Sequence, residues 1–181
     1  MRIITGIYKG RRFDIPRTFK ARPTTDFAKE NIFNVLNGYV DFETCRTLDL
    51  FSGTGSISLE FLSRGCPEVV SVEADRDHYA FIKKCIEKLG TERSTLIRGD
   101  VFKFLSGCRR QFDLIFADPP YELKRLEELP SIIFANDLLS PGGLFVFEHG
   151  KRNDFSSSPY FVEHREYGSV NFSMFRKNDT E

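Results

Sequence analysis

Apolar residues along this chain fall into two alternating patterns, short continuous runs and stripes at helical spacing. The runs predict strands that begin at Thr47 and that cover residues 68–73, 94–98, 112–117 and 144–148. The stripes predict helices from Asp26 toward Gly38, from Ser56 toward Gly65 and from Asp75 to Gly90, and a helical segment over 123–139 that Pro130 interrupts. Because strands that alternate with helices pair in parallel with right-handed crossovers, we predict an α/β fold with helices on both faces of a sheet.

Both ends of the chain carry β-prone runs separated by short turns. The runs are residues 2–8 and 11–15 at the beginning and residues 160–167 and 170–176 at the end. We therefore predict a small N-terminal β-hairpin, and a C-terminal antiparallel hairpin that completes a mostly parallel, seven-stranded sheet. Residues 141–143, Pro-Gly-Gly, are expected to turn the chain into the strand at 144–148.

The length allows one domain with a small appendage, and the charge pattern indicates where the two meet. The chain has 181 residues, 40% of them hydrophobic, and a formal net charge of zero. Residues 1–22 hold seven basic side chains against Asp14 alone, a net charge of +6, so the remainder carries −6. We expect residues 1–22 to form a basic arm and residues 23–181 the main domain. The arm residues predicted to bind phosphates are Arg2, Lys9, Arg11, Arg12 and Arg22. A solvated basic hairpin is the alternative.

The composition argues against several classes of protein. No charged and apolar leader opens the chain, and no apolar run approaches the ~20 residues that span a bilayer, so we expect a cytoplasmic protein without a membrane partner. The four cysteines lack the Cys-x-x-Cys spacing of metal ligands and the three histidines do not cluster, so no metal site is predicted. Among the histidines, only His149 follows a predicted parallel strand.

The strand that begins at Thr47 runs directly into a glycine turn, residues 51–55, and then into a helix at Ser56. Glycines in such a turn leave backbone N–H groups open to a ligand, which is typical of a nucleotide-type pocket. A dinucleotide fingerprint requires a third glycine where Ser58 stands, so the pattern does not favour NAD.

Acidic residues follow the predicted parallel strands, where ligands bind in sheets of this kind. Glu73 lies about 20 residues beyond the glycine turn, a spacing suited to ribose hydroxyls, although an exposed strand-end acid is the alternative. Asp100 is suited to an adenine amino group with Val101 beside the ring, or is only a helix N-cap. Asp49 lies between two leucines and needs partners, so we expect it to order the glycine turn and the polar end of the ligand.

This order of features resembles the class I S-adenosylmethionine-dependent methyltransferases. The resemblance implies a Rossmann-like fold and S-adenosylmethionine as the methyl donor. The residues then predicted to bind this cofactor are Asp49, Phe51, Gly53, Gly55, Glu73, Ala74, Asp100 and Val101.

The tetrapeptide 118–121, Asp-Pro-Pro-Tyr, resembles the methyltransferases that act on exocyclic amino groups of bases. The lone pair of such an amine is delocalised into the ring, so a site must draw the N–H hydrogens away and leave the lone pair free. We predict that the Asp118 carboxylate and the Pro119 carbonyl accept these hydrogens, and that Tyr121 stacks on an extruded base. Attack on the sulfonium is in line, so positioning carries the rate rather than a covalent enzyme intermediate. A plain Pro-Pro turn would not require the flanking acid and aromatic residue.

Motifs along nearly the whole chain narrow the resemblance to the bacterial small-subunit ribosomal RNA guanine-N2 methyltransferase family. They are Arg2-Ile-Ile-Thr-Gly6, Lys9-Gly-Arg-Arg12, Arg22-Pro-Thr-Thr-Asp26, the segments 48–55 and 112–121, Glu148-His149 and the closing segments at 167–168 and 172–175. The resemblance implies N2-methylguanine in 16S ribosomal RNA as the product. It also implies that the basic hairpin holds the RNA, either free or in an assembling small ribosomal subunit.

Two other functions remain open at this point. The tetrapeptide also serves adenine, as in adenine-N6 DNA methyltransferases, but the chain has no room for a target-recognition domain. A non-catalytic RNA-binding or assembly factor would have no need of Asp118 and Tyr121. The sequence leaves open which guanine is modified and which form of the RNA is the substrate. We expect a monomer, since nothing in the sequence indicates an obligate dimer.

Overall fold

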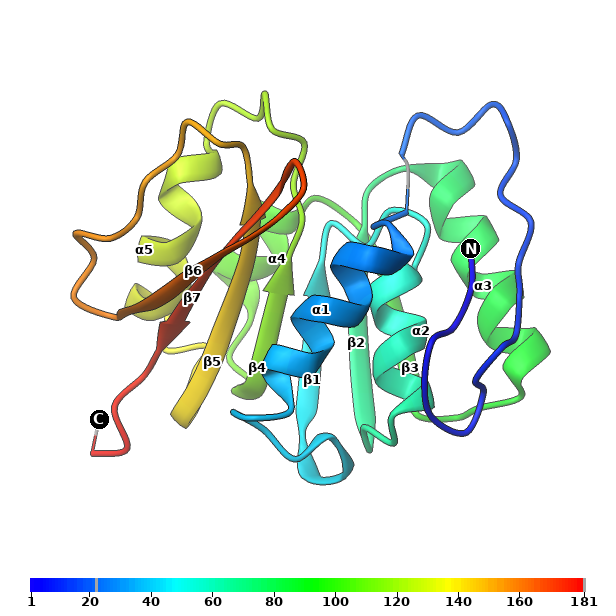
Figure 1. Cartoon of the computed structure of the whole chain (residues 1–181), viewed down its shortest axis with the longest axis horizontal. Helices are drawn as coiled ribbons and strands as arrows, with labels where there is room; N and C mark the ends of the chain where they lie inside the picture. Colours follow the sequence, from blue (N-terminus) through cyan, green and yellow to red (C-terminus); the bar gives the residue numbers. More distant parts are fainter. Residues whose placement is uncertain (22, 181) are drawn as a thin grey trace.

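This computed structural model describes residues 1–21 and 23–180. They contain one seven-stranded sheet of order β3-β2-β1-β4-β5-β7-β6 (Figure 1). The strands are β1 (Arg46–Leu50), β2 (Glu68–Glu73), β3 (Ser94–Arg98), β4 (Phe112–Ala117), β5 (Leu139–His149), β6 (Phe161–Tyr167) and β7 (Val170–Arg176). Strands β1 to β5 pair in parallel, and β7 is antiparallel to both β5 and β6. The predicted mostly parallel sheet with a C-terminal antiparallel hairpin is confirmed.

Helices cover both faces of this sheet (Figure 1). On one face lie α1 (Asp26–Leu36), α2 (Ser56–Ser63) and α3 (Arg76–Leu89), and on the other lie α4 (Val101–Gly107) and α5 (Leu129–Ala135). Alternate residues of β4 enter the two cores: Leu114 and Phe116 pack with α1–α3, whereas Ile115 and Ala117 pack with α4 and α5. Because β4 is buried on both faces, its sequence is a continuous apolar run rather than an alternating one.

Side-chain caps set where the helices begin. The Thr25 hydroxyl accepts a hydrogen bond from the Ala28 N–H, and the Asp75 carboxylate accepts from two N–H groups in the first turn of α3. Asp100 caps α4 in the same way through the Lys103 N–H. Helix α4 was not among the helices predicted from the apolar pattern, because its seven residues make barely two turns.

Two boundaries differ from those predicted. Strand β5 begins at Leu139 rather than at residue 144, and residues 141–143 lie within it instead of forming a turn. The register explains this, because Phe112 pairs with Leu139 while Leu114 pairs with Leu144, so the extra residues bulge from an otherwise paired strand. The interrupted segment becomes the 3₁₀ turn η2 (Leu126–Glu128) followed by α5, with Pro130 in the first turn of α5, where its missing N–H costs no hydrogen bond.

The N-terminal hairpin pairs over a shorter length than predicted. The Ile3 N–H donates to the Arg11 carbonyl and the Phe13 N–H donates to the Met1 carbonyl, each at 3.0 Å. Arg2 and Arg12 form a single isolated bridge, so residues 2–8 and 11–15 are not two regular strands. The antiparallel pairing is confirmed, and the predicted strand lengths are wrong.

A side chain of helix α2 accepts hydrogen bonds from backbone N–H groups that would otherwise pair in a longer hairpin. The Ile4 and Thr5 N–H groups donate to the two oxygens of the Glu60 carboxylate, each at 3.0 Å. Glu60 is fully buried and pairs with Lys29 at 3.6 Å and with Arg64 at 3.2 Å. Burial lowers the pKa of Lys29, whose ammonium group also donates to the Arg2 carbonyl at 2.6 Å. This buried network fixes the N-terminal segment to α1 and α2.

No helix among the described residues is long and apolar enough to cross a membrane. Within the same residues, no three or more histidine, cysteine or acidic side chains gather closely enough to hold a metal ion. All four cysteines are free thiols. Burial raises the pKa of the Cys85 thiol to about 11, so this thiol is neutral at physiological pH.

Gly6 provides a test of how the N-terminal segment is anchored. It has a φ of +99°, and a Cβ there would lie 1.9 Å from the Ser63 carbonyl oxygen, whereas Gly10 has a φ of +83° and open space around it. We expect Gly10→Ala to lower the free energy of unfolding by about 1–2 kcal/mol through backbone strain alone, and Gly6→Ala to lower it by about 1–3 kcal/mol more.

Urea unfolding measures both losses, and trypsin cleavage at Lys9 to Arg12 reports whether the segment is released. Equal losses in the two variants would contradict the contact with α2.

Candidate functional site

A cavity of about 720 Å³ opens at the carboxyl ends of the strands, around β1 and β4. Strand order reverses at this point, because β2 and β4 lie on opposite sides of β1 although β1 precedes both. Open α/β sheets bind ligands at such a switch point. The volume lies within the usual range of small-molecule sites.

The glycine turn forms one wall of the cavity. Its backbone is left-handed at Phe51, with a φ of 59°, and at Gly53 and Gly55, with φ of 58° and 82°. A side chain at Phe51 makes this conformation costly, and such strain tends to be kept at ligand sites. Gly55 does not line the cavity: a Cβ there would lie 3.0 Å from Ile82 Cγ1, so this glycine lets α3 approach the turn.

Glu73 connects the glycine turn to the end of β2. One carboxylate oxygen accepts from the Gly53 N–H at 2.6 Å, and the other accepts from the Asp75 N–H at 3.0 Å. The His78 imidazole lies 3.8 Å from the second oxygen. Each oxygen retains a further lone pair, and the residue lines the cavity, so the carboxylate remains suited to a pair of hydroxyl donors.

Asp49 has the partners that its burial requires. Its carboxylate accepts from the Ser58 hydroxyl at 2.5 Å, and Ser58 is in turn 2.6 Å from the Ser71 hydroxyl. Burial, and to a lesser degree the charge of Glu73, raises the pKa of Asp49 to about 7. The serine that replaces the third fingerprint glycine therefore holds an acid at the base of the cavity.

Asp118 and Tyr121 meet a third residue, Glu148, at the far wall of the cavity. Ala117 pairs with Phe147 in the sheet, so the residues that follow them, Asp118 and Glu148, lie at the ends of adjacent parallel strands. The Tyr121 hydroxyl donates to Glu148 Oε1 at 2.9 Å, while the residue remains 45% exposed. Burial, followed by the charge of Glu148, holds the pKa of Asp118 well above its usual range, and burial also raises the pKa of Glu148.

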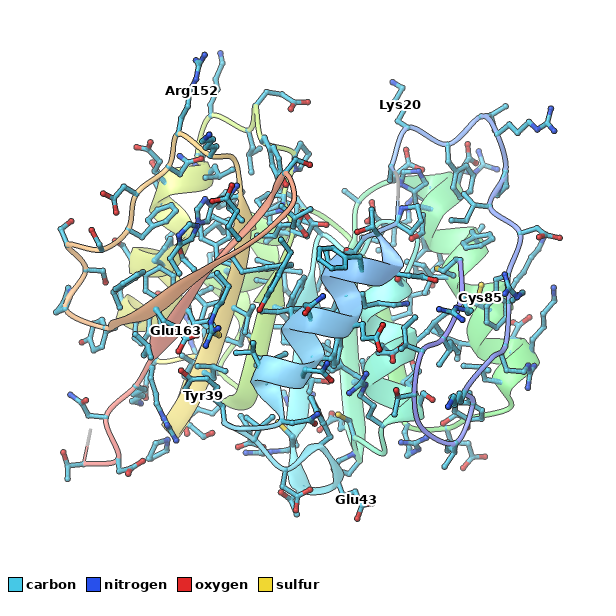
Figure 2. The ribbon with its side chains drawn as sticks, in the orientation of Figure 1. Lys20, Tyr39, Glu43, Cys85, Arg152 and Glu163 are labelled. Atoms are coloured by element: carbon cyan, nitrogen blue, oxygen red, sulfur yellow. The ribbon has the colours of Figure 1, made fainter. Side chains whose placement is uncertain are left out.

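Acidic side chains dominate the charge of this cavity. Among the residues that the structure describes, seven of them line it: Asp49, Glu73, Asp75, Asp100, Asp118, Glu122 and Glu148. Among the described lining residues, Lys20 is the one lysine or arginine, and it lies on the rim (Figure 2). A surplus of carboxylates in a partly closed space favours a cationic ligand and disfavours an anionic one such as a pyrophosphate.

The structure brings together most of the residues predicted for the cofactor and for catalysis. Those that line the cavity are Asp49, Phe51, Gly53, Glu73, Ala74, Asp100, Val101, Asp118, Pro119 and Tyr121. The predicted phosphate-binding residues Arg2, Lys9, Arg11 and Arg12 do not line it, and Arg22 lies outside the described residues.

Residues 1–21 of the basic arm lie beside α2 and α3 and lead from there toward α1 (Figure 1). Arg11 donates to the Lys88 carbonyl at the end of α3, at 3.1 Å. Helix α3 starts just after Glu73 and has 14 residues, so its end lies about 20 Å from the cavity edge. Arg2 is held in an ion pair with Asp26 at 3.0 Å. Arg11 therefore lies far from the cavity, whereas Lys20, at the end of the arm, lines it.

The sequence prediction missed Glu148, Lys20 and His78 among the lining residues. Glu148 could have been predicted from the sequence, because it is an acidic residue at the end of a predicted parallel strand. His149, by contrast, does not line the cavity: it is buried, with Nε2 2.7 Å from the Ser173 hydroxyl and Nδ1 2.8 Å from the Gly150 carbonyl. Burial lowers its pKa, so it is a neutral packing residue.

Comparison with known proteins gives matches over almost the whole chain. A family model described as "Conserved hypothetical protein 95" matches residues 1–176. A protein of Haemophilus influenzae named ribosomal RNA small subunit methyltransferase D is 34% identical over 155 residues, which cover 83% of this chain and 79% of the relative.

Solved structures also match most of the chain. A hypothetical protein of Thermus thermophilus has a TM-score of 0.84 and 28% identity, covering 97% of this chain and 98% of its own. An RNA methyltransferase from Salinibacter ruber, solved in complex with S-adenosyl-L-homocysteine, has a TM-score of 0.66 and 18% identity over 87% of this chain and 95% of its own, and shares the fold.

Asp49→Asn tests the buried acid of the cavity. The folded-state pKa is about 7 and the unfolded-state pKa about 4, so the folded protein binds the extra proton between these values and the wild type loses stability as pH rises through that window. The asparagine does not titrate and still accepts from Ser58. We expect the free energy of unfolding of the variant, relative to wild type, to rise by roughly 1 kcal/mol per pH unit between pH 5 and pH 7. Urea unfolding across this range measures the difference, and a difference independent of pH would mean that Asp49 ionises normally.

Proposed function

Because the chain belongs to the family of the ribosomal RNA small subunit methyltransferases D, we propose that it transfers a methyl group from S-adenosylmethionine to the exocyclic N2 amine of a guanine in 16S ribosomal RNA. The observation that carries the proposal is the position of Asp118 and Tyr121 on the wall of an acid-lined cavity that also contains the glycine turn. A dinucleotide site would require a third glycine where Ser58 stands. A metal site would require a cluster of ligands, and the described residues contain none.

The chain's residues fit S-adenosylmethionine in both shape and charge. The Glu73 carboxylate is proposed to bind two ribose hydroxyls, and Asp100 and Val101, which also line the cavity, are proposed to contact the adenine ring. The surplus of carboxylates favours a ligand that carries a sulfonium and an ammonium group. When bound, this cofactor supplies an electrophilic methyl group.

Asp118, Pro119 and Tyr121 are proposed to prepare the amine for attack. The Asp118 carboxylate and the Pro119 carbonyl accept the two N–H hydrogens, which leaves the nitrogen lone pair directed toward the methyl group. Tyr121 is held by its hydroxyl on Glu148, so its exposed ring presents a fixed face on which a base can stack. As the new C–N bond forms and the S–C bond breaks, the amine loses one proton, which Asp118 accepts and passes to solvent.

The arm and the main domain are proposed to bind different parts of the substrates. Residues 23–181 hold the cofactor and the target base, and residues 1–22 hold the RNA backbone through the exposed cations Lys9, Arg11 and Arg12. Since Arg11 contacts the end of α3, about 20 Å from the cavity edge, the RNA would extend along α3 from the flipped base. We further propose that the protein acts as a monomer in the cytoplasm, where small subunits assemble.

The experiment that tests the function is transfer of labelled methyl to three acceptors in parallel. These are small ribosomal subunits from cells that lack the protein, the RNA extracted from them, and duplex DNA. We expect label as N2-methylguanine in a ribosomal acceptor, and comparison of the two identifies the substrate form. Label in DNA adenine alone, or none at all with cofactor bound, would overturn the proposal.

Asp118→Ala separates catalysis from binding. We expect the single-turnover rate of transfer to fall by about 10²–10⁴-fold, because one acceptor for the amine hydrogens is lost. Cofactor affinity, measured by calorimetry with S-adenosylhomocysteine, should change little. Glu43→Gln is the control, since Glu43 lies at the opposite edge of the sheet from Lys20 (Figure 2). An equal loss of transfer and cofactor affinity would contradict the role given to Asp118.

Charge reversal in the arm tests the proposed RNA contacts. The double variant Arg11→Glu and Arg12→Glu should bind the RNA more weakly, and the slope of log K against log salt concentration should decrease by about 2. Arg109→Glu, at an exposed basic residue just beyond α4, should change the slope less. Filter binding at several salt concentrations measures the slopes, and an unchanged slope in the double variant removes the arm from the interface.

A further inference from the structure

Glu148 occupies the cavity wall in an arrangement that the proposed reaction does not by itself require. The residue is 6% exposed, and its two carboxylate oxygens have different surroundings. Oε1 accepts from the Tyr121 hydroxyl at 2.9 Å, whereas Oε2 is buried and has no hydrogen-bond donor. The neighbouring polar group is the Asp118 carboxyl, which follows the adjacent strand in register. A buried acceptor without a donor is costly, so a proton between the two carboxyls would satisfy it.

We propose that Glu148 and Asp118 form a carboxyl pair that shares one proton, and that Glu148 acts as a positioning residue which fixes Tyr121 and sets the pH at which Asp118 becomes an acceptor. The inference rests on the proposed function, and it adds a residue and a pH dependence to that site. In the pair, the proton lies on Asp118 and is donated to Glu148 Oε2, since Oε1 is already occupied by Tyr121.

The charged groups around Asp118 all disfavour its ionisation. Asp118 faces Asp49 from β1, Glu148 from β5 and Tyr121 from its own turn, and each of the two carboxylates disfavours ionisation of Asp118. None of the lysine or arginine side chains in the described residues pairs with Asp49, Asp118 or Glu148. Like charges this close do not all ionise, and the proton is retained.

The shared proton has a consequence for the reaction. A protonated Asp118 cannot take the proton that the amine loses as the C–N bond forms, so the shared proton must leave to solvent before transfer. Replacing Glu148 by glutamine removes one negative charge and supplies an N–H donor to Asp118. The variant keeps an amide oxygen for the Tyr121 hydroxyl. Asp118 should then ionise at lower pH while Tyr121 remains in place.

Nuclear magnetic resonance tests the carboxyl pair without reference to activity. Protein labelled with ¹³C at the aspartate carboxyls is titrated, and the Asp118 signal is assigned from its absence in Asp118→Asn. We expect the Asp118 midpoint to fall by about one pH unit or more in Glu148→Gln and in Glu148→Ala relative to wild type. The control Glu43→Gln, with the same loss of charge at the opposite edge of the sheet, should not move it (Figure 2). An unchanged midpoint in both Glu148 variants overturns the pair.

The pH profile of single-turnover methyl transfer to ribosomal RNA connects the pair to function. We expect the acid limb of the profile to move to lower pH in Glu148→Gln by the shift seen in the titration. Its rate at high pH should stay within about tenfold of wild type. Glu148→Ala should show the same limb with a raised KM for RNA, since Tyr121 loses its anchor. A merely structural Glu148 would lower the rate at every pH and leave the limb in place, which would overturn the inference. A shifted Asp118 midpoint with no transfer in any protein would retain the pair and overturn the proposed function.

Discussion

Three carboxyl groups, those of Asp49, Asp118 and Glu148, meet at the ends of adjacent parallel strands with no cationic side chain of the described residues paired to them. Burial raises the pKa of all three. Parallel pairing causes this arrangement, since it brings the carboxyl ends of β1, β4 and β5 to one edge. A ligand with positive charge relieves the repulsion, and this is the physical reason that the cavity suits a sulfonium cofactor.

The rest of the molecule holds this edge rigid. The two cores on either side of β4 fix the strands, and the close approach of Ile82 to Gly55 fixes the glycine turn. A second buried ionic network, Glu60 with Lys29 and Arg64, holds the basic arm against α1 and α2. Breaking such a pair leaves an uncompensated buried charge, so the arm is bound to the domain more firmly than its short hairpin implies.

Much of this arrangement was predictable because it follows from local pattern and topology. Continuous apolar runs mark strands buried on both faces, and acids after those strands must meet at one edge. Glu73 was predicted from its spacing and Asp118 from its tetrapeptide, and both line the cavity. The family resemblance is confirmed, and so is the mostly parallel sheet.

Other features depend on contacts that a sequence does not display. The alignment of Glu148 with Asp118 depends on a bulge at residues 141–143 that shifts the register of β5. The short pairing of the hairpin depends on Glu60, which lies more than 50 residues away and takes two of its backbone donors.

The surplus of carboxylates should make the cavity select a cationic cofactor. The direct measurement is calorimetric binding of S-adenosylmethionine, its neutral thioether product S-adenosylhomocysteine, and NAD to the same protein at pH 8, at low and high salt. We expect both S-adenosyl compounds to bind, added salt to weaken binding of the sulfonium compound more than that of the thioether, and NAD not to compete. Binding of NAD with displacement of S-adenosylmethionine would contradict it.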